Sequence, residues 1–151
     1  CVGGFGRSLT THALGTYSLA LVASPEIRRQ YPDFITADQN IPVPFIINEP
    51  SCVFRQIFER YLGQKSIALD HTIELWSIPT IKNLVKSDVG ISYLPRFSVQ
   101  AELAEGSLAE IPTELTGTTI TAVCGHHKNK WLSPLMQLFL ELCTDKIRSE
   151  V

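Results

Sequence analysis

Short apolar runs of strand length alternate with amphipathic segments of helix length along most of the chain. Residues 17–23 (YSLALVA) and 44–48 (PFIIN) are apolar, and such runs are typical of strands buried on both faces. The segment 51–62 instead gathers its apolar side chains on one helical face, namely Val53, Phe54, Ile57, Phe58, Tyr61 and Leu62. Strands that alternate with helices indicate an α/β fold with a largely parallel sheet.

Capping and breaking residues set the expected limits of the elements. Ser51 is expected to cap the helix that begins there, and Gly63 to end it. Further helices are predicted to begin at Ser77-Ile-Pro79 and Ser133-Pro134 and to span 97–104 before Gly106, and further strands are predicted at 68–75, 90–94, 108–111 and 118–124.

Charge and composition exclude several classes of function. The formal net charge is −2 and the basic residues are scattered, whereas a domain that grips nucleic acid usually carries a basic face. No run approaches the ~20 apolar residues of a membrane span. The four cysteines form no C-x-x-C pair, so we expect free thiols in a reducing cytosol. The chain opens on Cys1 without an initiator Met, so we expect a fragment of a longer protein.

Motifs for catalysis or metal binding are not found. The sequence has no G-x-S-x-G elbow, Walker A loop or dinucleotide fingerprint. His126 and His127 are adjacent, and neighbours on an extended segment point to opposite sides, so we expect a solvated loop and no metal. Cys52 at a helix start is open to two interpretations, a nucleophile or redox sensor of lowered pKa or a small buried residue. We expect neither catalytic residues nor a cofactor.

Two predicted helices begin directly after a strand, at Glu49-Pro-Ser-Cys52 and Trp76-Ser-Ile-Pro79. In α/β folds ligands bind outside the carboxyl ends of strands, where helix N-termini offer unpaired backbone N–H groups. Each of these starts also carries a hydroxyl. Together they predict a site for a small anion.

The segment from Leu75 to Ile111 closely resembles the effector-binding domain of the LysR-type transcriptional regulators. It contains S-I-P-T-I-K-N-L-V, then G-I-S-Y-L-P, then V-Q-A-E-L-A-E-G-S-L. The stretches Leu14–Pro25 and Trp131–Cys143 resemble the first crossover and the closing helix of that family. One departure lies at residues 85–90 (VKSDVG), where the family usually has small residues and glycine. Asp88 keeps a turn possible there, since Asp tolerates left-handed backbone.

The resemblance implies two Rossmann-like lobes of the type 2 periplasmic-binding-protein kind, with the second lobe complete and the first partial. Residues 1–16 would end the first lobe and approach the hinge. Residues 17–117 would form the first crossover strand (Tyr17–Ala23) and the second lobe. Residues 118–151 would form the return crossover (Thr119–Cys124) and a helix of the first lobe. By this resemblance, the N-terminal winged helix-turn-helix and the start of the first lobe would lie outside the chain.

The family also implies functional residues. The effector would lie in the cleft between the lobes, held by Ser51, Cys52, Val53, Trp76, Ser77 and Ile78 of the second lobe and by Gly3, Gly4, Phe5, Val123 and Cys124 near the hinge. Head-to-tail pairing of two domains would use the helix 51–62, through Phe54, Arg55, Phe58 and Tyr61.

We therefore expect a cytoplasmic, effector-sensing regulatory domain that binds a small, anionic metabolite and modulates transcription as a homodimer or tetramer of the full-length regulator. DNA contact would come only through the absent winged helix-turn-helix, with no membrane partner. The alternatives are an α/β enzyme with Cys52 as nucleophile and a solute-binding protein for transport.

Overall fold

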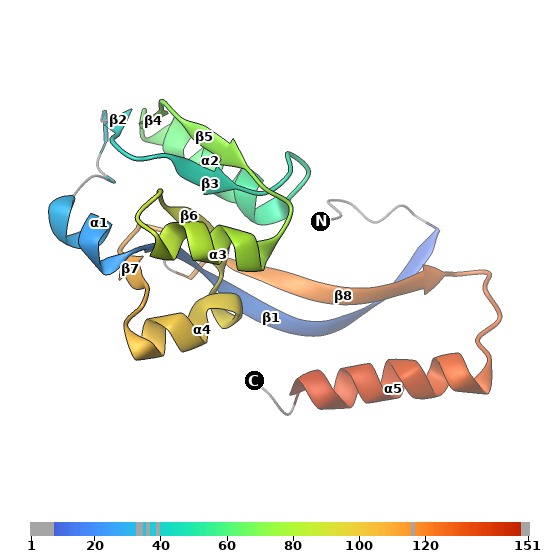
Figure 1. Ribbon diagram of the computed structural model, residues 1–151. Coiled ribbons are helices and arrows are strands. Elements are labelled where there is room, and N and C mark those ends of the chain that lie inside the picture. Colours follow the sequence, from blue (N-terminus) through green and yellow to red (C-terminus); the bar gives the residue numbers. More distant parts are fainter. Residues whose placement is uncertain (1–7, 33–34, 36, 39, 116, 149–151) are drawn as a thin grey trace.

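Two long antiparallel strands extend from one end of an α/β body. The computed structural model describes residues 8–32, 35, 37–38, 40–115 and 117–148 (Figure 1). Strand β1 (Leu9–Ala23) pairs with β8 (Thr119–His127) from Leu9↔His127 to Ser18↔Thr119. We call this pair the ribbon. The register shifts between Ala13 and Gly15, so that one residue of β1, Leu14, bulges from the ladder.

Strand β1 belongs to both parts of the molecule. Beyond Ser18 it enters the body, where Leu19–Val22 pair with β6 (Ser92–Pro95) and Leu21–Ala23 pair with β7 (Ala109–Ile111), all antiparallel. Its burial follows this change, since the side chains of 20–23 are buried whereas those of 8–18 are exposed or half-buried. The apolar half of the strand lies in the body and the polar half in the ribbon.

The remaining strands of the body are parallel. Strand β2 (Asn40–Ile41) pairs with β4 (Ala68–Leu69), and β3 (Phe45–Ile47) pairs with β5 (Thr72–Glu74). A parallel bridge, Phe45↔Ile91, sets β3 beside β6, with the Ile46 amide donating to the Ile91 carbonyl at 2.8 Å. The carboxyl ends of β3, β5 and β6 therefore meet at one edge of the body.

Five helices lie in the part of the chain that the structure describes. Helices α2 (Val53–Gln64), α3 (Ile78–Lys86) and α4 (Arg96–Glu105) pack on the body strands, and α1 (Pro25–Gln30) follows β1 directly. Helix α5 (Pro134–Arg148) lies alongside the ribbon (Figure 1). Its apolar side chains Leu135, Leu138, Phe139 and Leu142 are exposed in this structure. In the part of the chain described, no helix has the length and apolarity to cross a membrane.

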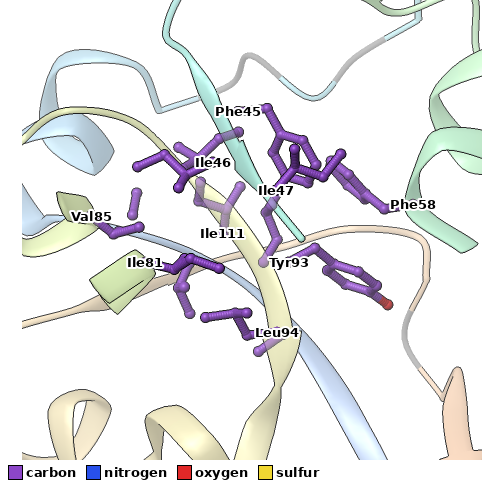
Figure 2. Close-up of a cluster of buried hydrophobic side chains, with 14 of the residues drawn as sticks. Phe45, Ile46, Ile47, Phe58, Ile81, Val85, Tyr93, Leu94 and Ile111 are labelled. Atoms are coloured by element: carbon purple, nitrogen blue, oxygen red, sulfur yellow. The ribbon is translucent and has the colours of Figure 1, made fainter. Parts of the chain in front are cut away.

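One apolar cluster holds the body together (Figure 2). The rings of Phe45 and Phe58 lie 4.8 Å apart and those of Phe58 and Tyr93 5.0 Å apart. Branched side chains, among them Ile81, Val85 and Leu94, fill the rest of the cluster and are 0% exposed. The hydroxyl of Tyr93 is buried in this apolar surround without a hydrogen-bond partner.

Several local predictions are confirmed. The Ser77 hydroxyl accepts from the Thr80 amide at 3.4 Å and the Ser133 hydroxyl from the Met136 amide at 3.3 Å, as capping residues do. Gly106 ends α4 with φ of 76°, and Asp88 takes the left-handed conformation at φ 60°. The α/β fold is also confirmed, but the sheet is not largely parallel as predicted. The four-stranded sheet of β1, β6, β7 and β8 is antiparallel, and the pairs β2–β4 and β3–β5 are parallel.

Other local predictions are wrong. Helix α2 begins after Cys52 rather than Ser51 and continues through Gly63 to Gln64, because glycine is permissive in backbone conformation and also adopts the helical one. The strands of the ribbon are longer than predicted, and His126 and His127 lie in β8, not in a loop. Helix α1 was not predicted, although Ser24 caps it and Pro25 and Glu26 occupy its first turn.

Replacing Gly90 by Ala should destabilise the protein. The added Cβ would lie 2.1 Å from the Pro44 carbonyl oxygen, which is fixed because it accepts from the Ile91 amide at 3.0 Å. We expect a loss of about 1–3 kcal/mol in the free energy of unfolding, measured by urea denaturation. As a control, Gly63→Ala places its Cβ in open space on an exposed helix and should gain about 0.5–1 kcal/mol. A Gly90→Ala protein as stable as its parent would contradict the close approach of β3 and β6.

Replacing Tyr93 by Phe should stabilise the protein and change its alkaline unfolding. Burial raises the pKa of Tyr93 from 10.0 to about 12. The contribution of the protonated Tyr93 to the free energy of unfolding is therefore complete below pH 10 and is lost as the pH rises toward 12. Phe keeps the ring contacts and removes the unpaired hydroxyl, which should add about 1 kcal/mol at neutral pH. The measurement is the free energy of unfolding as a function of pH. Phe58→Leu, in the same cluster, is the control because it keeps the Tyr93 hydroxyl. It should lower the free energy of unfolding without altering the slope of that free energy against pH between pH 10 and 12.

Candidate functional site

Two loops that carry predicted ligand-binding residues lie side by side at the carboxyl edge of the body. The first joins β3 to α2 and contains Ser51, and the second joins β5 to α3 and contains Trp76 and Ser77. The parallel register sets Ile47 beside Glu74, and the Leu75 amide donates to the Ile47 carbonyl at 2.9 Å. Both loops face the side of the body from which the ribbon extends (Figure 1).

The predicted residues on these loops differ in accessibility. Ser51 and Ser77 are exposed, Val53 and Ile78 are half-buried, and Trp76 is 79% exposed. The edge therefore offers two hydroxyls, the first amides of α2 and α3, and an aromatic face. Such a set can hold a small anion by hydrogen bonds and cover its apolar part without a charged side chain.

Cys52 lies in the interior, with 1% of its surface exposed. Burial raises the pKa of its thiol by more than the hydrogen bonds from the Arg55 and Phe54 amides lower it. The neutral thiol is favoured, whereas a cysteine nucleophile is the thiolate. Among the two interpretations left open by the sequence, the geometry supports the small buried residue.

Arg55 ties the two loops together. Its guanidinium donates to the Asn48 carbonyl at 2.7 Å, to Glu74 at 2.9 Å and to Glu59 at 2.8 Å. Burial lowers the pKa of Arg55 and the two carboxylates raise it, with a net increase. Because Asn48 begins one loop and Glu74 precedes the other, this network fixes the position of both helix N-termini. The role of Arg55 in joining the two loops could not be predicted from the sequence, since Glu74 lies far from Arg55 along the chain.

Three of the predicted dimer-contact side chains are buried within the body. Phe58, Tyr61 and Phe54 are 0%, 6% and 8% exposed and belong to the core cluster of the body, because the apolar stripe of an amphipathic helix faces its own lobe. These side chains are not on the surface. Any contact made through α2 would instead use its exposed side, which carries Gln56, Glu59, Arg60 and Gly63.

The residues predicted near the hinge do not lie on the two loops at the carboxyl edge. Val123 pairs with Ala13 and Cys124 with His12 in the ribbon, and both are half-buried. Cys124 lines an apolar cavity of about 480 Å³ between β8 and α5. Gly3, Gly4 and Phe5 lie outside the described residues. The structure thus brings together the residues of the second lobe, but not all eleven predicted residues.

A third helix start at the same edge was missed. Helix α4 follows β6 directly, and its Phe97 is 57% exposed and packs edge-on against Tyr17 of β1 with ring centroids 4.9 Å apart. The rule that selected the other two helix starts, a strand followed at once by a helix, also applies at Leu94-Pro-Arg96. Phe97 and Tyr17 therefore join the candidate site.

The chain is similar to known proteins over most of its length. The family model "LysR substrate binding domain" matches residues 6–148. The uncharacterized HTH-type transcriptional regulator YfiE of Escherichia coli K12 is 48% identical over 134 residues, which cover 89% of this chain and 45% of YfiE. The chain thus spans about half the length of this relative.

Solved structures show the same fold. The regulatory domain of CcmR from Synechocystis PCC6803, in complex with 2-PG, has a TM-score of 0.75 at 19% identity, over 97% of this chain and 72% of that one. Full-length LysG of Corynebacterium glutamicum with bound effector Arg has a TM-score of 0.70 at 14% identity, over 98% of this chain and 49% of that one. The family model matches nearly all residues of this chain, and this match shows that the chain belongs to the LysR substrate-binding domain family.

Proposed function

We propose that the chain is the effector-sensing part of a LysR-type transcriptional regulator, and that a small anionic metabolite binds at the carboxyl edge of the body. One observation carries the proposal: the loops of Ser51 and Ser77 meet beside the point where the ribbon leaves the body. A ligand at this edge would touch the base of the ribbon as well as the lobe.

The backbone amides of Ser51 and Val53 and those at 77–78 would bind the polar group of the effector, with the hydroxyls of Ser51 and Ser77. The Cys52 amide between them donates to the Glu49 carbonyl at 3.0 Å. Trp76, or Phe5 from outside the described residues, would pack on its apolar part. CcmR in complex with 2-PG and LysG with bound Arg support a small ligand with charged groups. Val53 and Ile78 would line the base of the site, whereas Val123 and Cys124 would act from the ribbon.

The proposed division of the chain follows the ribbon. Residues 17–117 would form the first crossover and the second lobe, and residues 1–16 and 118–151 would belong to the first lobe and its hinge. Ligand binding can shift the arrangement of two lobes only by its differential affinity for the two states. The shift would change the spacing of DNA-binding domains in a cytoplasmic homodimer or tetramer of the full-length regulator, with the outer side of α2 as one contact.

We propose a sensor rather than an enzyme. The buried Cys52, whose pKa is raised, supports this choice, because the enzyme alternative required a reactive thiolate at that position. Membership of a family of transcription regulators supports the sensor over a transport-type solute-binding protein.

The function is tested with the full-length regulator. A thermal-shift screen of small carboxylates, phosphates and amino acids, including 2-PG and arginine, should give at least one compound that raises the melting temperature. That compound should also change the affinity of the regulator for its promoter DNA. A stabilising compound that is chemically converted by the protein would favour the enzyme alternative.

Ser77→Ala should weaken binding of the compound found in this screen by about 10-fold, since it removes a hydrogen bond to an anion. It also removes a helix cap, which costs about 1 kcal/mol of stability. Ser133→Ala is the matched control, because it removes the same kind of cap from α5 and should leave affinity unchanged. Both affinities are measured by calorimetry, together with Ser51→Ala. Unchanged affinity in both Ser77→Ala and Ser51→Ala would disprove the site.

A further inference from the structure

Two histidines face each other across the ribbon, apart from the proposed effector loops. His12 of β1 and His126 of β8 approach with their Nε2 atoms 3.4 Å apart. Their ring centroids are 5.5 Å apart and their planes 24° apart. The Nε2 atoms are closer together than the ring centroids, so each ring turns its Nε2 atom toward the other ring. The register explains the approach, since His12 pairs with Cys124 and Thr10 with His126, which makes the histidines diagonal neighbours on one side of the ribbon.

The second nitrogen of His126 has its own partner. Its Nδ1 lies 3.1 Å from the His127 carbonyl oxygen. A carbonyl only accepts, so Nδ1 carries the proton and Nε2 of the neutral ring presents its lone pair toward His12. Metal-binding histidines in proteins are usually oriented in this way, by donation of the other ring nitrogen to a fixed acceptor.

The spacing of the two Nε2 atoms fits a shared ion. At 3.4 Å the two nitrogens form a long hydrogen bond, since N–H donors usually lie about 2.7–3.2 Å from their acceptor. Two nitrogens bound at about 2.0–2.1 Å to one tetrahedral ion lie roughly 3.3–3.4 Å apart. The backbone of the paired strands holds both rings, so little reorganisation is needed to admit an ion.

The surroundings leave room for water. His12 lines a cavity of about 310 Å³ with Gln137, Leu140, Glu141 and Thr144 of α5. Both histidines are only half-buried. No group of three or more His, Cys, Asp and Glu suited to a metal occurs among the residues that the structure describes, so water would complete the coordination.

We propose that His12 and His126 together bind one divalent transition-metal ion of the zinc, nickel or copper class, which imidazole ligands suit. The ion links the two crossover strands of the ribbon. This proposal does not depend on the effector proposal, because it rests only on the contacts of the ribbon and α5, although Cys124 of the proposed effector site pairs with His12.

The test uses the full-length protein and zinc chloride as the probe, with magnesium chloride as the control salt. Calorimetry should show zinc binding that His12→Gln and His126→Gln each weaken at least about 10-fold, the smallest loss usually seen when even an outer-shell partner is removed. His127→Gln is the matched control, because His127 neighbours His126 in sequence but lies on the opposite side of the strand. It should bind zinc like the parent. Equal loss in His127→Gln, or none in the other two variants, would overturn the proposal.

A second measurement needs no variant. Modification of the parent protein with diethyl pyrocarbonate, followed by peptide mass spectrometry, reports the reactivity of each histidine. Zinc should protect His12 and His126 and leave His127 reactive. Absence of protection at concentrations that saturate the calorimetric signal would assign that signal to another site and overturn the proposal. Effector binding by Ser77→Ala is measured separately, so failure of either proposal can be recognised.

Discussion

The pairing of β1 with two different sets of strands is the constraint on which the rest of the structure depends. In its first half β1 has one partner, β8, and in its second half it lies between β6 and β7. A continuous strand cannot bend at the boundary without losing ladder hydrogen bonds, so the direction of the ribbon is fixed by the sheet of the body. The carboxyl edge, the loops of Ser51 and Ser77 and the base of the ribbon are therefore held in one place by backbone hydrogen bonds.

Side-chain interactions then refine this frame. The core cluster fixes the distance between α2 and the strands through Phe45, Phe58 and Tyr93, and the Arg55 network fixes the two loops relative to each other. The apolar cluster is non-directional, whereas the guanidinium requires acceptors in defined places. Together they allow a ligand site on short loops to be preorganised.

Much of this fold could be predicted from the sequence, because its signals are local. Strand-length apolar runs, the caps at Ser77 and Ser133 and the turn at Asp88 all depend on neighbouring residues. The polar half of the ribbon and its histidine pair could not be predicted, since Leu9–Thr16 resembles a loop until β8 pairs with it. The same holds for Arg55, whose partner Glu74 is brought close only by the parallel register. The family resemblance implies a dimer contact through the three aromatics of α2, and it does not show that these side chains pack in the core cluster of their own body.

The bulge at Leu14 has a consequence for the two halves of β1. Successive side chains of a strand alternate between its faces, and one inserted residue exchanges odd and even positions beyond it. Because the register passes from Ala13↔Val123 to Gly15↔Ala122, His12 and Tyr17 share one face of the strand despite their odd separation. The bulge therefore shifts the alternation of side chains by one residue, so that β1 presents His12 and Tyr17 on the same face.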